Sequence, residues 1–110
     1  MTRIINIAQD YTKFPGGRYP GDGPGNGTTF RTKFLVPALK SGEPIVIQLD
    51  GAAGYPSSFL EEAFGGLVRV EKINPEKILS SIKFEANSPG FQRHIPRITS
   101  YIRGAGNAAA

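Results

Sequence analysis

The feature that most constrains the fold is an apolar run that leads through a short loop into an amphipathic helix. The run Pro44–Leu49 is interrupted only by Gln48, which is the pattern of a central strand covered on both faces. A glycine-containing loop follows, and beyond Ser57 and Ser58 apolar residues recur at helical spacing as far as Arg69. A strand, a loop and a helix in this order place a site at the strand ends of an α/β sheet.

The rest of the chain alternates between strand-like and helix-like segments. The further elements that we expect are a strand at 4–7, a loop at 11–27, a helix from Thr28 or Thr29 that Pro37 kinks or ends, a helical turn at 75–79, a strand at 82–86 and a helix from 88 to 104. This alternation predicts an α/β fold with a small mixed, mostly parallel β-sheet and helices packed on it. We expect one domain of residues 1–103 and a flexible tail of residues 104–110.

Composition narrows the class of protein. The chain has 110 residues, of which 39% are hydrophobic and 20% are charged, as is typical of one globular domain. It has no cysteine, which excludes disulfides and thiolate chemistry, and the single histidine, His94, cannot build a His-rich metal site. We therefore expect neither a metal nor a cofactor.

Location and charge give two further expectations. No run approaches the roughly eighteen apolar residues of a membrane span, and the N-terminus lacks a signal-peptide hydrophobic region, so we expect a cytoplasmic location with no membrane partner. The net charge of +4 is spread along the chain without a basic cluster, so nucleic-acid binding is a weaker hypothesis.

The two serines at the predicted helix start allow two interpretations. In the structural one, Ser58 and Glu61 form an S-x-x-E capping box, in which the hydroxyl and the carboxylate satisfy each other's backbone amides. This leaves Ser57 without a structural task. A hydroxyl beside a helix N-terminus is also a favourable place for a phosphate, although Glu61 and Glu62 would repel the added charge. Both interpretations stay open on the sequence alone.

The glycine-rich segment is a second candidate. Gly16, Gly17 and Arg18 could bring backbone amides and a positive charge together around an anion. The segment is not a P-loop, because the G-K-[ST] ending is missing. An ordinary turn-forming loop and a loop that contacts a phosphate, a nucleotide or a partner both fit this pattern.

No catalytic arrangement emerges from the residues. Asp50, Ser57 and His94 are the residue types of a nucleophilic triad, but no G-x-S-x-G elbow surrounds the serine. His94 lies beside an arginine on the predicted last helix, where a histidine is more often solvated. Glu61 and Glu62 are adjacent and point about 100° apart on a helix, so they cannot face each other. We expect no enzyme.

Residues around the serines could bind a protein partner. Tyr55 and Phe59 flank the serines, and exposed aromatics beside a polar rim are typical of protein interfaces. With Glu62 they would form a surface that covers residues 54–62. The alternative is that Phe59 belongs to the core, which its spacing to Ala63 also allows.

Several segments of the chain resemble those of a known domain. The segment IVIQLDGAAGYPSSFLEEAFGGL resembles the strand, loop and helix core of STAS domains, the fold of bacterial anti-sigma factor antagonists. PGGR at 15–18, FR at 30–31 and SSFLEEAFGGLVR at 57–69 look more specifically like the bacterial STAS-like domain family of unknown function.

This resemblance implies a STAS-like fold and a regulatory role. In the antagonists a histidine-kinase-like ATPase partner phosphorylates the first serine of the pair, and that position corresponds to Ser57. The chain departs from their motif at Pro56, where they carry aspartate, and at Phe59, where they carry glycine. The hypothesis is a regulatory protein-interaction module. The alternative is a module that binds a nucleotide or phosphate between the glycine-rich loop and the helix start at Ser57 and Ser58.

Overall fold

The computed structural model describes the backbone of residues 1–109 and the side chains of residues 1–105. Its sheet has three parallel strands in the order β1 (Arg3–Asn6), β2 (Ile45–Gln48) and β3 (Ile82–Glu85). Ile5 pairs with Ile47, and Ile47 pairs with Phe84. A small α/β fold with a parallel sheet is therefore confirmed.

Two of the helices are continuous but contain a wider central segment. The first comprises α1 (Gly27–Phe30), the π-helical segment η3 (Arg31–Leu35) and α2 (Val36–Lys40), and the second comprises α3 (Ser57–Leu60), η4 (Glu61–Gly65) and α4 (Gly66–Arg69). The remaining helices are α5 (Pro75–Ser81), α6 (Pro89–Gln92) and α7 (His94–Ala109), with short turns η1 (Ile7–Tyr11) and η2 (Pro20–Asp22).

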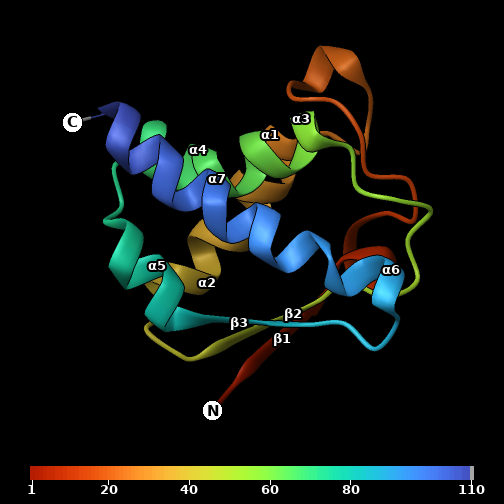
Figure 1. The fold of residues 1–110 in the computed structure, drawn as a ribbon, viewed down its shortest axis with the longest axis horizontal. Helices are drawn as coiled ribbons and strands as arrows, with labels where there is room; N and C mark the ends of the chain where they lie inside the picture. Colours follow the sequence, from red (N-terminus) through yellow and green to blue (C-terminus); the bar gives the residue numbers. More distant parts are fainter. Residues whose placement is uncertain (110) are drawn as a thin grey trace.

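The helices cover one face of the sheet (Figure 1). Side chains on the covered face are buried: Ile5, Ile45, Ile47 and Ile82. On the other face Ile4 is 60% exposed and Val46 is half-buried. The expectation that both faces of β2 are covered is wrong.

A row of polar side chains on the open face accounts for this difference. Asn6 donates to Gln48 at 3.3 Å, and Gln48 donates to Glu85 at 3.4 Å. These polar groups satisfy one another while remaining accessible to water, so this end of the face needs no cover. Gln48, the one polar residue in the apolar run of β2, belongs to this row.

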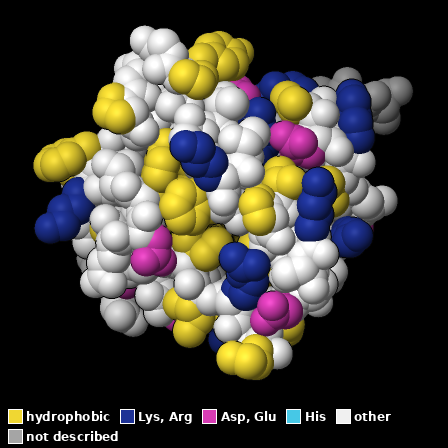
Figure 2. All heavy atoms as spheres, turned by 180° about the vertical axis from the view of Figure 1, so that it is seen from behind, with side chains coloured by type: hydrophobic (Ala, Val, Ile, Leu, Met, Phe, Trp, Pro, Cys, Tyr) yellow, Lys and Arg dark blue, Asp and Glu magenta, His cyan; other side chains and the backbone are white. Residues whose placement is uncertain are grey.

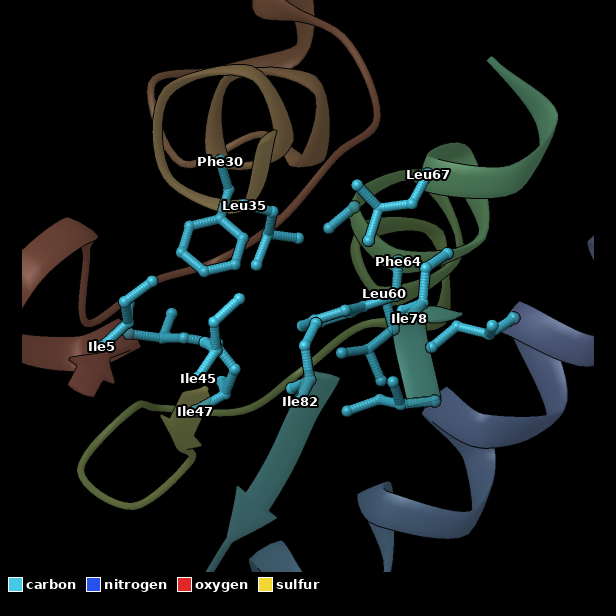
Figure 3. Close-up of a cluster of buried hydrophobic side chains, with 14 of the residues drawn as sticks. Ile5, Phe30, Leu35, Ile45, Ile47, Leu60, Phe64, Leu67, Ile78 and Ile82 are labelled. Atoms are coloured by element: carbon cyan, nitrogen blue, oxygen red, sulfur yellow. The ribbon is translucent and has the colours of Figure 1, made fainter. Parts of the chain in front are cut away.

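The core lies between the sheet and the helices. Figure 3 shows side chains from the strands and from the helices pointing toward one another. The fully buried side chains include Phe30, Leu35, Ile47, Phe64 and Ile78. Burial of such side chains, at about 25 cal/mol per Å² of apolar surface, holds the helices against the sheet.

Three predicted helix ends differ from the observed ones. Asn26, rather than Thr28 or Thr29, caps α1, since its side chain accepts from the Thr29 amide at 2.8 Å. Pro37 does not end its helix, because the helix widens directly before it, where the proline ring would otherwise crowd the preceding turn.

The third difference concerns the C-terminal helix. Helix α7 continues through Gly104 to Ala109, so the predicted boundary at residues 103 and 104 is not a helix end. The helix contains Gly104 and Gly106, and each glycine in a helix interior costs about 1 kcal/mol, which a helix can tolerate. The tail was predicted to extend to Ala110, which lies outside the described residues.

Candidate functional site

The serine pair lies where the loop after β2 enters α3. In a parallel sheet the loops after the strands gather at the carboxyl edge, which is the usual place for a binding site. Helix α3 begins at Ser57, which is exposed, while Ser58 is the second helical residue and is half-buried. Pro56 occupies the N-cap position and makes no side-chain hydrogen bond there.

The predicted capping box is therefore wrong. Ser58 lies inside the helix, two positions after the N-cap residue Pro56, and Glu61 extends away from it toward two arginines. The amides of the first helical turn have no carbonyl acceptor within the helix, as at any helix start. The exposed Ser57 hydroxyl thus lies beside unpaired backbone donors.

A cluster of charged side chains surrounds Glu62, which lies in the η4 segment of the same helix. We call it the Arg–Glu cluster, and it comprises Arg18, Arg31, Arg69, Glu61, Glu62 and Glu71. Glu62 is at its centre, with a side chain that is only 2% exposed. Its carboxylate accepts from Arg31 at 2.8 Å, from Arg69 at 3.3 Å and from Arg18 at 3.4 Å.

The outer residues complete the network. Arg31, which is almost as buried as Glu62, also donates to Glu71 at 3.0 Å and to the backbone carbonyl of Glu62. Glu61 accepts from Arg69 at 2.9 Å and pairs with Arg18. Three positive and three negative side chains balance, so the cluster is neutral as a whole.

The arginines determine the ionisation of Glu62. Burial by itself would raise the pKa of Glu62, but the hydrogen bond from Arg31 and the charges of Arg31 and Arg69 outweigh it and hold the pKa below the usual value. The carboxylate is therefore ionised at neutral pH and acts as a fixed counter-ion rather than as a proton donor.

Two glycines leave room for this cluster. A Cβ atom on Gly66 would lie 3.0 Å from Cζ and 3.2 Å from Cδ of Arg31. A Cβ atom on Gly65 would lie 2.6 Å from a carboxylate oxygen of Glu61. The Gly65–Gly66 pair of the sequence motif thus serves the packing of the charged side chains.

The glycine-rich loop is held by its own hydrogen bonds. The carboxylate of Asp22 accepts from the amides of Arg18 at 3.1 Å and Tyr19 at 3.0 Å, and the Gly16 amide donates to the carbonyl of Gly25 at 3.0 Å. The Gly17 carbonyl accepts from the Gly27 amide at 3.0 Å. At the anion site predicted for Gly16, Gly17 and Arg18, the amides of Gly16 and Arg18 are already paired with Gly25 and Asp22, and the Arg18 guanidinium is paired within the Arg–Glu cluster, which argues against an anion there.

The predicted partner-binding side chains are buried. Tyr55 is 4% exposed, Phe59 is fully buried and Glu62 is 2% exposed, so none of them is available as a surface anchor. The Tyr55 hydroxyl donates to the carbonyl of Leu49 at 2.7 Å, and burial together with the charge of Asp50 raises its pKa. The Phe59 ring lies 5.9 Å from that of Phe30. The alternative that placed Phe59 in the core is confirmed.

The residue types of a triad are not brought together. Asp50 accepts from the backbone amides of Asn87 at 2.8 Å and Ser88 at 3.2 Å. His94 was expected at the surface but is 4% exposed, packed edge-on against Tyr55 at 5.4 Å between ring centroids. Within residues 1–109 neither Asp50 nor His94 hydrogen-bonds to Ser57.

Two general properties of the described part of the chain follow. No group of three or more His, Cys, Asp or Glu side chains there could hold a metal ion, and no helix has the length and apolar character needed to cross a membrane. Figure 2 shows the face opposite to the one in Figure 1, and on it the Lys and Arg side chains lie at several separate places among hydrophobic and polar ones.

Comparison with known families shows to which family the chain belongs. The family model described as a STAS-like domain of unknown function matches residues 26–90, which is more than half of the chain. The chain belongs to this family. Searches of curated proteins and of solved structures found no significant match.

The STAS-like match covers most of the Arg–Glu cluster. Residues 26–90 include both serines and every member of the cluster except Arg18, which the preceding loop contributes. Sequence reasoning missed Arg31, Arg69 and Glu71 as cluster residues. Part of the signal lies in the motif segments, because FR contains Arg31 and LVR contains Arg69. No spacing rule, however, links an arginine to a glutamate 31 or 40 residues away.

Proposed function

We propose that this STAS-like chain is a cytoplasmic regulatory module that binds a protein partner through the surface around Ser57. In this proposal a histidine-kinase-like ATPase phosphorylates Ser57 and thereby changes the affinity for a partner. The observation that carries it is the position of Ser57, an exposed hydroxyl at the first residue of a helix that continues to Arg69. The chain would act by binding and not as an enzyme.

The electrostatics near Ser57 support a phosphate there. The unpaired amides and the positive end of the helix dipole stabilise a charge of about −1.5 to −2 at neutral pH. Unpaired carboxylates at Glu61 and Glu62 would repel this charge. In the structure both carboxylates are paired with arginines, so the repulsion that a phosphate would meet is reduced.

The surface that would meet the partner differs from the one first expected. Since Tyr55, Phe59 and Glu62 are buried, the proposed contact consists of Pro56 and Ser57, which are exposed, with Gly54 and Ser58 at half-buried positions. Phe59 is bulkier than the glycine that the antagonists carry at this position, and an exposed ring there would hinder an approaching kinase. Its side chain lies in the core, so it leaves the hydroxyl accessible.

The proposal of a binding protein rather than an enzyme rests on the neighbours of Ser57. A nucleophilic serine needs a base within hydrogen-bond reach. Among the described residues, His94 is bonded to Arg97 and Asp50 to backbone amides, so neither serves the serine in this way. A phosphoacceptor needs no such base of its own when the kinase supplies one.

The direct test is intact-protein mass spectrometry with site mapping of the chain recovered from the cells that encode it. We expect a phosphate on Ser57 that is lost in Ser57→Ala and kept in Ser58→Ala, a matched control one residue away. A phosphate on Ser58 alone, or no phosphate under any growth condition, would argue against the phosphoacceptor role.

Partner binding is tested separately by affinity capture with wild type, Ser57→Glu and Ser58→Glu chains. We expect Ser57→Glu to change the amount of a specific ATPase partner recovered, and Ser58→Glu to change it less, because Ser58 is less exposed. Equal recovery with all three chains would contradict the proposed docking surface.

A further inference from the structure

A pocket of about 430 Å³ lies beside the loop that leads to Ser57, outside the Arg–Glu cluster. In Figure 1 the loop before α3 and helix α6 lie on the same side of the molecule, beyond the carboxyl ends of the strands. The loop side of the pocket is apolar and the helical side is basic. The residues that line these two sides include Phe14, Pro15, Pro56, Arg93, His94 and Arg97.

The two arginines of this pocket lack a counter-ion in the described structure. Arg93 and Arg97 are both exposed, and no carboxylate of the described residues lies within 4.0 Å of either guanidinium. Arg103, which lies in helix α7 with Arg97, pairs with Glu76 at 2.7 Å. Two like charges four residues apart repel each other when no anion lies between them.

His94 also lies on the basic side of the pocket. Arg97 lies 3.2 Å from Nδ1 of His94, and a guanidinium can only donate, so Nδ1 accepts and the ring proton is on Nε2. Burial and the nearby charges of Arg97 and Arg93 lower the pKa of His94, which agrees with a neutral ring. Nε2 has no hydrogen-bond partner among the described residues.

The apolar side is unusually open. Phe14 is 75% exposed, which is rare for a phenylalanine in a domain whose other described Phe side chains are buried or half-buried. Pro15 is buried beside it and Pro56 is exposed. A ring of this kind offers a flat surface for an apolar or aromatic group of a ligand.

We propose that this pocket binds a small phosphate monoester that carries an apolar or aromatic group. The phosphate lies between Arg93 and Arg97, and the organic group packs against Phe14. A phosphate monoester carries a charge of about −1.5 to −2 at neutral pH, which matches two arginines, whereas a carboxylate balances only one. This site differs from the glycine-rich loop and does not require that Ser57 be phosphorylated.

The first experiment is a titration followed by ¹⁵N NMR with phenyl phosphate, inorganic phosphate and benzoate as probes. We expect shift changes confined to residues 14–15, 53–56 and 93–97, and the tightest binding for phenyl phosphate. Inorganic phosphate lacks the ring and benzoate lacks the second charge, so both should bind more weakly. No saturable change with phenyl phosphate, or benzoate binding as tightly as phenyl phosphate, would overturn the proposal.

Variants then test the assigned residues. Arg93→Gln and Arg97→Gln should each weaken phenyl phosphate binding by about tenfold or more, because each removes a charged hydrogen bond. Both arginines are exposed, so the fold should be kept, which circular dichroism checks. Arg103→Gln is the matched control, with the same change in charge in the helix that contains Arg97 but outside the pocket.

A further variant separates the two halves of the site. Phe14→Ala should weaken phenyl phosphate binding and leave inorganic phosphate binding unchanged. If Arg103→Gln weakens binding as much as Arg97→Gln, the probe responds to overall charge and the pocket assignment is wrong. If Phe14→Ala has no effect, the proposed contact with the organic group is wrong.

Discussion

Substitution of Glu62 by glutamine removes the central charge of the Arg–Glu cluster while keeping the size of the side chain. Arg31 is the residue most affected, because its side chain is 4% exposed and loses its closest carboxylate. Breaking a buried ion pair from one side costs about 3–5 kcal/mol, since the remaining charge is left without compensation. Glu71 still accepts from Arg31 at 3.0 Å, which places the expected loss near the lower limit, about 3 kcal/mol.

The more exposed arginines add little to this figure. Arg18 and Arg69 are 38% and 40% exposed and keep Glu61 as a partner, so water and that carboxylate replace most of what they lose. A loss of about 3 kcal/mol is a large share of the 5–15 kcal/mol that typically stabilises a domain. In a chain of this size it corresponds to a fall in the melting temperature of about 12 °C.

Urea unfolding followed by far-UV circular dichroism measures the loss. Glu76→Gln is the matched control, because Glu76 is 73% exposed and pairs with Arg103 at the surface. Its cost should stay below about 1 kcal/mol. If Glu62→Gln costs no more than Glu76→Gln, the cluster does not hold the fold together.

A double variant separates ion pairing from packing. Replacement of both Arg31 and Glu62 by methionine removes both buried charges and keeps comparable volume. The pair of changes should cost less than the sum of the two single changes, because neither charge is then left uncompensated. Strict additivity of the two costs would contradict this account.

The other predictions concern packing, a buried hydrogen bond and pH. Gly27→Ala should destabilise the fold by about 1–3 kcal/mol, because its Cβ atom would lie 2.8 Å from a backbone oxygen of α3. Gly21 has open space around it, so Gly21→Ala should change the free energy of unfolding by no more than about 0.5 kcal/mol. Tyr55→Phe should cost about 1–3 kcal/mol in urea unfolding, since the Leu49 carbonyl loses its donor. Burial, followed by the charges of Arg97 and Arg93, lowers the pKa of His94 from 6.5. Below that pH the folded chain therefore binds fewer protons than the unfolded chain, so the free energy of unfolding should fall as the pH drops through 6.5. The fall should be smaller in His94→Gln.

Much of the α/β layout was predictable from local pattern. The apolar run at β2 and the helical spacing after Ser57 identify a strand and a helix without tertiary information. Alternation of strands and helices was sufficient to predict a small mixed, mostly parallel sheet, because parallel strands need such crossovers. The motif segments also led to the correct family.

The site was predictable only in part. Ser57 was correctly placed at a helix start and is exposed, but the capping role of Ser58 required a helix that begins two residues later than the observed one. Glu61 and Glu62 were read as neighbours on one helix, whereas their partners come from residues 18, 31 and 69. No local rule could supply those partners, since the contacts form only when the loop and both long helices pack together.

The sequence by itself determined the elements, the family and the identity of the candidate serine, because these depend on periodicity, turn residues and motif. The tertiary structure decided which side chains are accessible. It buried Tyr55, Phe59 and His94, and it left one face of the sheet open. The physical reason is that local spacing determines the face of an element on which a side chain lies, while its exposure depends on which other elements pack against that face.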